Sequence, residues 1–313
     1  MDFFTKIKIP KANFSITHQD KILLIGSCFT ENIGNYLVQN CFKVNINPFG
    51  IIYNPISIFN VIKYIGTSKI YAVEDLLMNN ELYLSTDHHG KFSATSSDEI
   101  LENINSSIYI ANKHLQACEY IIITLGTAFV YHHIEQNKTV ANCHKLPSAH
   151  FQKRILSIAE IKNAFNEIQQ YINNKKIIFT VSPVRHWRDG AMENLRSKSI
   201  LIESIYQLID EYPNCRYFPA YEIMLDELRD YRFYNEDMLH PNELAVKYIW
   251  EKFSATYFHD ETTEVIKFID KGNALFAHKI KHSNTQEHRK LEENKLIYKA
   301  DFMQKYPNIE FPF

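Results

Sequence analysis

The segment KILLIGSCFTEN (residues 21–32) joins a strand pattern to a helix pattern with no linker between them. Residues 21–26 are almost continuously apolar, as in a strand that is buried on both faces of a parallel sheet. From residue 28 to residue 40, apolar side chains recur three and four positions apart, which predicts an amphipathic helix. A strand that passes directly into a helix is the building unit of parallel α/β sheets, so this segment decides the expected fold class.

The same alternation continues along the rest of the chain. Runs rich in Ile, Val, Phe or Tyr predict four more strands at 42–47, 120–126, 175–182 and 215–220. Helical periodicity separates and follows them at 56–65, 97–118, 157–174, 190–211 and 242–257. We therefore predict a three-layer α/β/α sandwich around a central, mostly parallel, doubly wound sheet of five strands.

Three segments lie outside this alternation. Residues of about 66–96 indicate a short helix and a hairpin, and about 127–151 indicate a second insertion containing a strand. We expect both insertions to leave the sheet at its C-terminal side, where active-site walls usually grow. Beyond residue 258 the chain is charged and helical, so we predict one domain over 1–258 and a helical extension over 259–313. The extension is expected either to be solvated on one side or to contact a partner subunit.

The composition excludes several functional classes. The chain has 313 residues, of which 45% are hydrophobic, and a formal net charge of −2, without the basic excess of a nucleic-acid-binding protein. Its 8 glycines form neither a dinucleotide-binding G-x-G-x-x-G nor a phosphate-binding P-loop. Its 5 cysteines include no C-x-x-C pair, which argues against a disulfide framework and a zinc ribbon. We expect no cofactor and no metal.

We expect neither a secretory signal nor a membrane span. The N-terminal stretch MDFFTKIKIPKANFS has no apolar core of a secretory signal, and no run of about 18 apolar residues could span a membrane. We expect a cytoplasmic protein with neither nucleic-acid nor membrane partners; the sequence does not predict its oligomeric state.

Ser27 is the first candidate for catalysis. Gly26 allows a sharp turn, so that Ser27 stands between the end of a strand and the start of a helix, at the edge where α/β proteins bind ligands. The helix dipole there favours an oxyanion beside the hydroxyl. Serine is also a common helix N-cap, which is the alternative interpretation. The neighbouring Cys28 is a rival nucleophile, although we expect it to be a core residue.

A base for this serine is found near the end of the strand–helix pattern. The sequence NEDMLHPN (235–242) places Asp237 three residues before His240 on a short loop. A serine nucleophile needs a base within hydrogen-bond reach and a carboxylate that orients the base. We therefore predict Ser27, His240 and Asp237 as a catalytic triad.

Further candidates follow the other strands. Gly50 and Thr127 each follow a strand, and with the Ser27 N–H they are predicted to form an oxyanion hole, unless they are ordinary strand-ending turns. Asn47, Arg185 and His186 are predicted to bind substrate; Arg185 in particular suits a carboxylate, a phosphate or a sugar hydroxyl, unless the loop uses it in an Arg–Asp pair.

The two insertions carry the pairs His88-His89 and Cys143-His144. No H-x-x-x-H or paired-Cys spacing accompanies them, so we expect roles in structure or in a substrate wall and no metal.

The sequence GSCFT (26–30) resembles the signature of the GSCFA-domain family, in which the fifth position is commonly alanine. Other stretches that resemble this family span most of residues 20–255: NPFGIIYNP (47–55), LGTAFVY (125–131), VANCHKLP (140–147), TVSPVRHWRDG (180–190) and RDYRFYNEDMLHP (229–241). A serine after the first strand, glycine-bearing turns after the next two, and a terminal D-x-x-H also resemble the SGNH/GDSL hydrolase superfamily.

This resemblance implies a three-layer fold and ester hydrolysis or acyl transfer. Carried over by position, Ser27 would be the nucleophile, His240 the base, Asp237 its orienting carboxylate and Gly50 an oxyanion donor. Two features depart from the superfamily: the usual Gly-Asp-Ser lacks its aspartate here, and the asparagine of a third G-x-N-D motif is not recognisable in GTAF (126–129).

Three functions are therefore consistent with the sequence. The first is a serine esterase that removes a small acyl or acetyl group from a carbohydrate or metabolite. The second is an O-acyltransferase that uses the same triad, and the third is a catalytically silent binding module. The expected partner is a small-molecule or carbohydrate ester.

Overall fold

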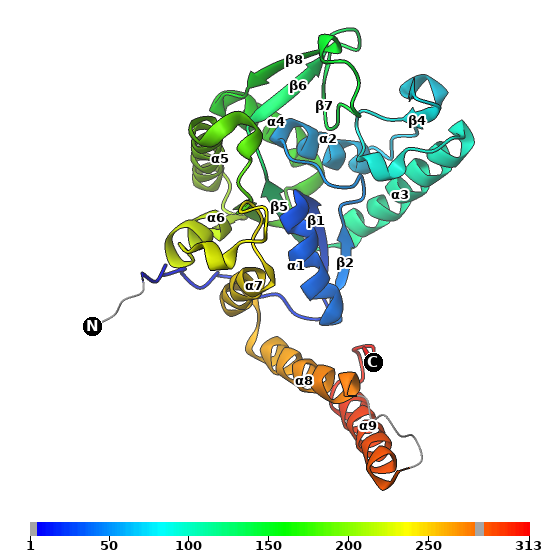
Figure 1. Ribbon diagram of the computed structural model, residues 1–313, viewed down its shortest axis with the longest axis vertical. Helices are drawn as coiled ribbons and strands as arrows, with labels where there is room; N and C mark the ends of the chain where they lie inside the picture. The colour runs from blue at the N-terminus through cyan, green and yellow to red at the C-terminus, as the bar shows by residue number, and fades with distance from the viewer. Residues whose placement is uncertain (1–4, 279–284) are drawn as a thin grey trace.

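The computed structural model describes residues 5–278 and 285–313 of the chain, and a parallel five-stranded sheet lies at its centre (Figure 1). In spatial order, its strands are β10 (Cys215–Phe218), β9 (Lys176–Val181), β5 (Tyr120–Leu125), β1 (Lys21–Gly26) and β2 (Lys43–Ile46). All four neighbouring pairs are parallel. The prediction of a three-layer α/β/α fold is confirmed, and all five expected strands are present.

Two helical layers cover the sheet, as strand β1 illustrates. Its residues Ile22 and Leu24 belong to one apolar core and its residues Leu23 and Ile25 to the other, because successive side chains of a strand point to opposite faces. One core contains α1 (Cys28–Gln39) and α7 (Glu243–Tyr257). The other contains α2 (Pro55–Gly66), α3 (Ser97–Ala117), α4 (Ile158–Ile172) and α5 (Gly190–Glu211). A strand with both faces buried is apolar throughout, as its sequence indicated.

The strand order reverses beside β1. The chain passes from β1 outward to β2, then returns to the other side of β1 as β5 and continues to β9 and β10. In open α/β sheets, ligands bind at the carboxyl ends of the strands where the order reverses. The ends of β1 and β5 are therefore the expected position of a site.

The two insertions add smaller sheets. The first forms a hairpin of β3 (Leu77–Asn79) and β4 (Leu82–Leu84), with two short 3₁₀ turns where a helix was expected. It follows helix α2 in the chain, and His88 and His89 near its end contact Phe49, which comes after the carboxyl end of β2. The second is an antiparallel sheet of β7 (Lys138–Val140), β6 (Phe129–His133) and β8 (Phe151–Ile155).

The last part of the chain projects from the α/β body as two helices, α8 (Asp260–Ala277) and α9 (Gln286–Lys305) (Figure 1). The start of α8 is attached to the body through Ile16, whose carbonyl accepts bonds from the His259 N–H and the Thr262 hydroxyl, both 3.2 Å long. Residues 279–284 of the predicted extension lie outside the described residues. None of the helices within 5–278 and 285–313 has the length and apolarity needed to cross a bilayer.

Candidate active site

Ser27 lies at the carboxyl end of β1, where Gly26 makes the turn into α1. Gly26 has φ +148°, and a Cβ at this position would stand 2.2 Å from the Thr124 carbonyl oxygen on β5, so only glycine fits. Ser27 itself is 1% exposed, and its hydroxyl makes no hydrogen bond within the described part of the chain. Its side chain therefore does not cap α1, although the residue holds the N-cap position.

The loop before α7 holds Asp237 and His240 as a bonded pair. The Asp237 carboxylate accepts the backbone N–H groups of Leu239 and His240, each at 2.9 Å, and the His240 Nδ1–H at 2.5 Å. These three bonds lower the pKa of Asp237 to about 2. Because Nδ1 donates to a carboxylate, neutral His240 has its lone pair on Nε2, as a general base requires.

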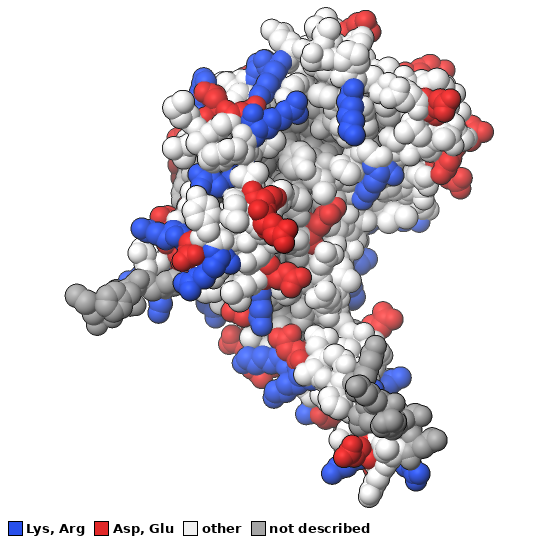
Figure 2. Space-filling model, viewed as in Figure 1, with Lys and Arg blue, Asp and Glu red and all other residues white. Residues whose placement is uncertain are grey.

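A cleft of about 600 Å³ separates this loop from α1. Its walls include Cys28, Glu31 and Tyr36 from α1 and His240 and Glu243 from the start of α7 and the loop before it. On this face, acidic side chains gather beside α1 and the loop, and basic ones gather toward β8 (Figure 2). The cleft therefore has an acidic wall close to His240.

Cys28, and not Ser27, reaches this cleft. Cys28 is half-buried and lines the cleft together with His240, so the expectation of a core cysteine is wrong. Burial raises the pKa of its thiol, which disfavours the thiolate that a cysteine nucleophile needs. Ser27 directly precedes Cys28 in the sequence, and no hydrogen bond joins Ser27 to His240 in the described structure.

The three backbone donors expected for the oxyanion hole each have a carbonyl partner. The Ser27 N–H donates to Thr124 O at 3.2 Å, the Gly50 N–H donates to Asn47 O at 2.7 Å, and the Thr127 N–H donates to Tyr53 O at 3.1 Å. The Thr127 hydroxyl pairs with Ser197 Oγ at 3.1 Å. In this arrangement none of the three N–H groups is free to bind an oxyanion.

Asn47 is placed beside Ser27. Its side-chain oxygen accepts the Gly26 N–H at 2.9 Å, directly before Ser27, while its Nδ2 is buried and has no hydrogen-bond partner among the described residues. Asn47 has φ +45°, a left-handed conformation that asparagine tolerates better than most residues. An amide nitrogen without a hydrogen-bond partner among the described residues therefore lies next to Ser27.

Arg185 and His186 lie on the loop after β9, which touches the His240 loop through the Arg185 N–H and Leu239 O at 3.2 Å. The Arg185 guanidinium lies over the Trp187 ring, 5.3 Å from its centroid, and its buried Nε has no partner within the described residues. The alternative Arg–Asp pair is not formed by Arg185, because Asp189 pairs with Lys153 of β8.

Lys198 is a residue of this edge that the sequence did not indicate. It lies on α5, is 1% exposed, and donates to the carbonyl oxygens of Gly126 and Ser182, both at 2.8 Å. Burial lowers its pKa to about 7. A lysine at an interior helix position is usually exposed, and its reach to residues 72 and 16 positions away has no signal in the sequence.

The histidines of the insertions support the loop after β2. His88 stacks on Phe49 with ring centroids 4.1 Å apart, and its Nδ1 bonds Ser85 Oγ at 2.9 Å. The His89 N–H donates to Phe49 O at 2.9 Å, and His144 Nε2 bonds Ser85 O at 2.8 Å. Across residues 5–278 and 285–313, no three His, Cys, Asp or Glu side chains converge as a metal site would require. The two insertions thus form a wall behind Gly50.

Comparisons with known proteins give two similar solved structures and one matching family. Among solved structures, the chain is similar to a Clostridium thermocellum family 3 carbohydrate esterase, with 9% identity, a TM-score of 0.37, and coverage of 79% of this chain and 97% of that one. It is also similar to the acetyl xylan esterase Est2A from the rumen bacterium Butyrivibrio proteoclasticus, with 10% identity and a TM-score of 0.36, over 77% of this chain and 64% of that one. No curated protein matches it significantly. The profile of the GSCFA family matches residues 21–253, which is more than half of the chain. The chain belongs to the GSCFA family.

Proposed function

We propose that this protein is a serine ester hydrolase that removes a small acyl group, such as acetyl, from a carbohydrate or another small alcohol. The observation that carries the proposal is the Asp237–His240 pair on a cleft whose opposite wall is the start of α1, directly beside the unpartnered Ser27 hydroxyl. The two esterases to which the chain is similar act on carbohydrate esters by their names, but the proposal rests on the site.

The chemistry would proceed in two steps through an acyl-enzyme. His240 Nε2 takes the proton from Ser27 Oγ as the oxygen attacks the acyl carbonyl, and His240 then returns the proton to the departing alcohol. Water attacks the acyl-enzyme with His240 again as the base, which releases the carboxylic acid and restores Ser27. In this mechanism Asp237 holds the imidazole in the required tautomer. The Ser27–His240 hydrogen bond would form as substrate binds, as is common for catalytic contacts that are long in a ligand-free site.

Ser27 is favoured over Cys28 as the nucleophile for a chemical reason. The raised pKa of the Cys28 thiol leaves little thiolate at neutral pH, whereas a serine needs only a base in reach. The buried Ser27 hydroxyl also lacks the capping bond that would explain a structural serine.

On the substrate side, Arg185 is the leading candidate for a polar contact. Its buried, unpartnered Nε lies on the loop that touches the His240 loop, so the guanidinium could bind a carbonyl, a hydroxyl or a carboxylate of the substrate. Asn47 and His186 would make further polar contacts to the substrate.

Covalent labelling tests the nucleophile directly. A fluorophosphonate probe should label the wild-type protein, and peptide mapping should place the phosphonyl group on Ser27. Ser27→Ala should abolish both labelling and p-nitrophenyl acetate hydrolysis, and the matched Cys28→Ser variant should retain most of both. Labelling at Cys28, or undiminished hydrolysis by Ser27→Ala, would overturn the assignment. Absence of labelling in the wild type would favour a silent binding module.

A further inference from the structure

Two buried side chains flank the Ser27 position, and each holds a hydrogen-bond donor that the fold does not use. Asn47 follows β2 and is 2% exposed, and Lys198 reaches the ends of β5 and β9 and is 1% exposed. Strand β1, which ends directly before Ser27, lies between β2 and β5. Asn47 therefore lies on the β2 side of the Ser27 position, and the contacts of Lys198 lie on its β5 side.

The hydrogen bond of the Asn47 side-chain oxygen fixes the position of its unbonded nitrogen. Its Oδ1 is fixed by the Gly26 N–H at 2.9 Å, so the amide plane is anchored one residue from Ser27. Its Nδ2 carries two N–H groups, is buried, and bonds nothing among the described residues. A buried N–H donor without a partner costs free energy, and a ligand group that accepts from Nδ2 would satisfy it during function.

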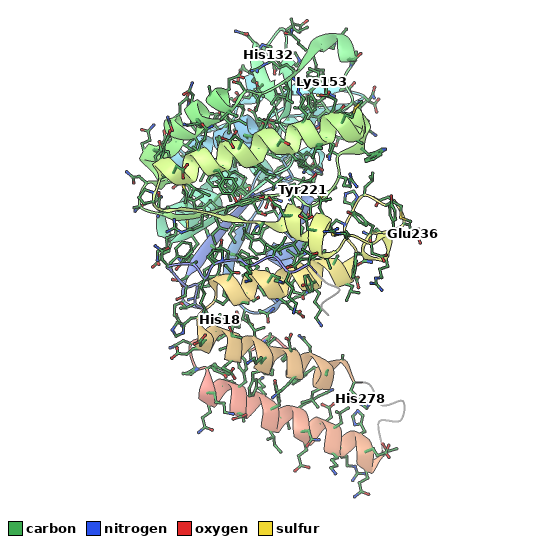
Figure 3. The ribbon with its side chains drawn as sticks, turned by 90° about the vertical axis from the view of Figure 1, so that its left-hand side faces the viewer. His18, His132, Lys153, Tyr221, Glu236 and His278 are labelled. Carbon is green, nitrogen blue, oxygen red and sulfur yellow. The ribbon has the colours of Figure 1, made fainter. Side chains whose placement is uncertain are left out.

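The free donor of Lys198 follows from counting its protons. An ammonium has three N–H groups, and two of them are directed to Gly126 O and Ser182 O. No ion pair with a carboxylate is found for Lys198 in the described part of the chain. The Tyr221 ring centroid lies 5.3 Å from its Nζ, and Figure 3 shows Tyr221 on α6 (Ala220–Glu222), next to helix α5. The third N–H has no hydrogen-bond acceptor among the described residues, and the site offers the charge the Tyr221 ring but no counter-ion.

We propose that Asn47 Nδ2 and Lys198 Nζ form the oxyanion hole of this site, in place of the backbone donors that are already bonded. The inference rests on the proposed serine mechanism, because the oxyanion is the carbonyl oxygen of the ester that Ser27 attacks. The negative charge that develops there gives Lys198 the counter-ion that the free protein lacks. Preorganised donors in a buried site stabilise such a charge strongly, because little water competes with them.

The charge state of Lys198 gives this arrangement a pH signature. Burial lowers the pKa of Lys198 to about 7, and the titratable groups that act on or respond to it are Cys28 on α1, Tyr221 on α6 and His186 after β9. None of these is an acid that would keep the amine protonated at neutral pH. The hole loses its positive charge as the pH rises, so the acylation rate should fall on the alkaline side.

Two substitutions remove the donors while they keep the local fold. Asn47→Asp keeps the oxygen that accepts the Gly26 N–H and tolerates the left-handed backbone, but it replaces the donor with an anionic oxygen. Lys198→Gln removes the titrating charge and, because its side chain is one bond shorter, withdraws the N–H donor from the position of Nζ. Each should lower kcat and the rate of fluorophosphonate labelling at Ser27 by about 10²–10³-fold, with KM little changed, as for the loss of one oxyanion donor.

Lys175→Gln is the matched control. Lys175 is also buried, at 7% exposure, and also donates to a backbone carbonyl, Gln116 O at 3.2 Å, but it precedes β9 at the opposite edge of the sheet. It should leave kcat unchanged. The kcat/KM of the wild type should fall at alkaline pH, and this fall should vanish in Lys198→Gln while it persists in Lys175→Gln.

The outcomes separate this inference from the proposed function. If Ser27→Ala is inactive but Asn47→Asp and Lys198→Gln keep wild-type kcat and labelling rates per folded molecule, the side-chain hole is wrong and the serine mechanism stands. An alkaline fall that persists in Lys198→Gln would likewise assign Lys198 a structural role only. If Ser27 is neither labelled nor required, both proposals fail together. Circular dichroism on each variant supplies the folded fraction.

Discussion

Two serines of this chain occupy helix N-cap positions with nearly the same backbone geometry, yet their side chains do different things. Ser157 precedes α4 with φ −83° and ψ 159°, and Ser27 precedes α1 with φ −70° and ψ 177°. Ser157 accepts the Glu160 N–H, and the Glu160 carboxylate accepts the Ser157 N–H at 2.9 Å, which forms a complete capping box. The Ser27 hydroxyl is buried and bonds nothing in the described chain. The same residue at the same position is thus structural in one helix and available for chemistry in the other.

The largest expected effect is the loss of ester hydrolysis when Ser27 is substituted. In the proposed triad, Ser27→Ala, His240→Ala and the double variant should each lose about 10³-fold or more of the ester hydrolysis rate and reach a similar residual rate, because triad members act as one unit. Ser27→Ala should change the free energy of unfolding by less than about 0.5 kcal/mol, since no capping bond is lost. Steady-state rates and urea unfolding measure both quantities. Multiplied losses in the double variant would contradict a triad.

The next effect concerns the residue before each serine. Gly26 has φ +148° and no room for a Cβ beside Thr124 O, whereas Leu156 before Ser157 is an ordinary core residue. Gly26→Ala should destabilise the fold by about 3 kcal/mol or more, because backbone strain and a backbone clash add. Gly190→Ala is a control with positive φ but nothing within 4 Å of a new Cβ, and it should cost clearly less. Equal losses in chemical denaturation would show that sterics at Thr124 do not matter.

The pH dependence of stability tests whether the Lys198 amine is buried at the sheet edge that holds Ser27. The folded-state pKa of Lys198 is lowered to about 7 from 10.5, so above pH 7 the unfolded chain binds more protons than the folded one. The contribution of Lys198 to the free energy of unfolding should therefore rise with pH between 7 and 10. It is least favourable below pH 7, where the buried amine is charged. From pH 7 to pH 9 the wild type should gain about 2 kcal/mol relative to Lys198→Met, measured by denaturant unfolding of both proteins. Parallel pH curves would show that the amine is not buried in this way.

The smallest effect is at the structural serine. Ser157→Ala removes the capping bond to Glu160 and should cost about 1 kcal/mol in thermal or chemical unfolding. The lowered pKa of Glu160 depends on its bonds to Ser157 and Arg154, and part of this dependence should disappear in the variant. Ester hydrolysis should stay at the wild-type rate per folded molecule. A lost rate here with an intact Ser27 would mean that the two serines have been assigned to the wrong roles.

The local parts of the site could be predicted because their interactions span few residues. Asp237 and His240 are three positions apart, and one loop is enough to bring their side chains together. Gly26 at the strand end could be predicted for the same reason, since a turn depends on the residues that make it. The triad as a whole stays a prediction, because Ser27 and His240 are not bonded to each other in the described structure.

The remaining features depend on partners far away in the sequence. The backbone N–H groups of Ser27 and Thr127 find carbonyl partners on neighbouring segments, at Thr124 and Tyr53. Cys28 lines the cleft because the loop before α7 lies opposite α1, which periodicity within α1 cannot reveal. Lys198 meets Gly126, 72 residues away, through the packing of α5 on the sheet.

The sequence by itself determined the five strands, the helices between them and the local geometry of the strand end at Gly26, because periodicity and turn chemistry act over a few residues. Only the tertiary structure decided the strand order, the partners of the backbone donors, and the burial of Asn47 and Lys198 on either side of β1. These follow from which strand packs beside which, and hence from the burial of apolar surface by the whole domain.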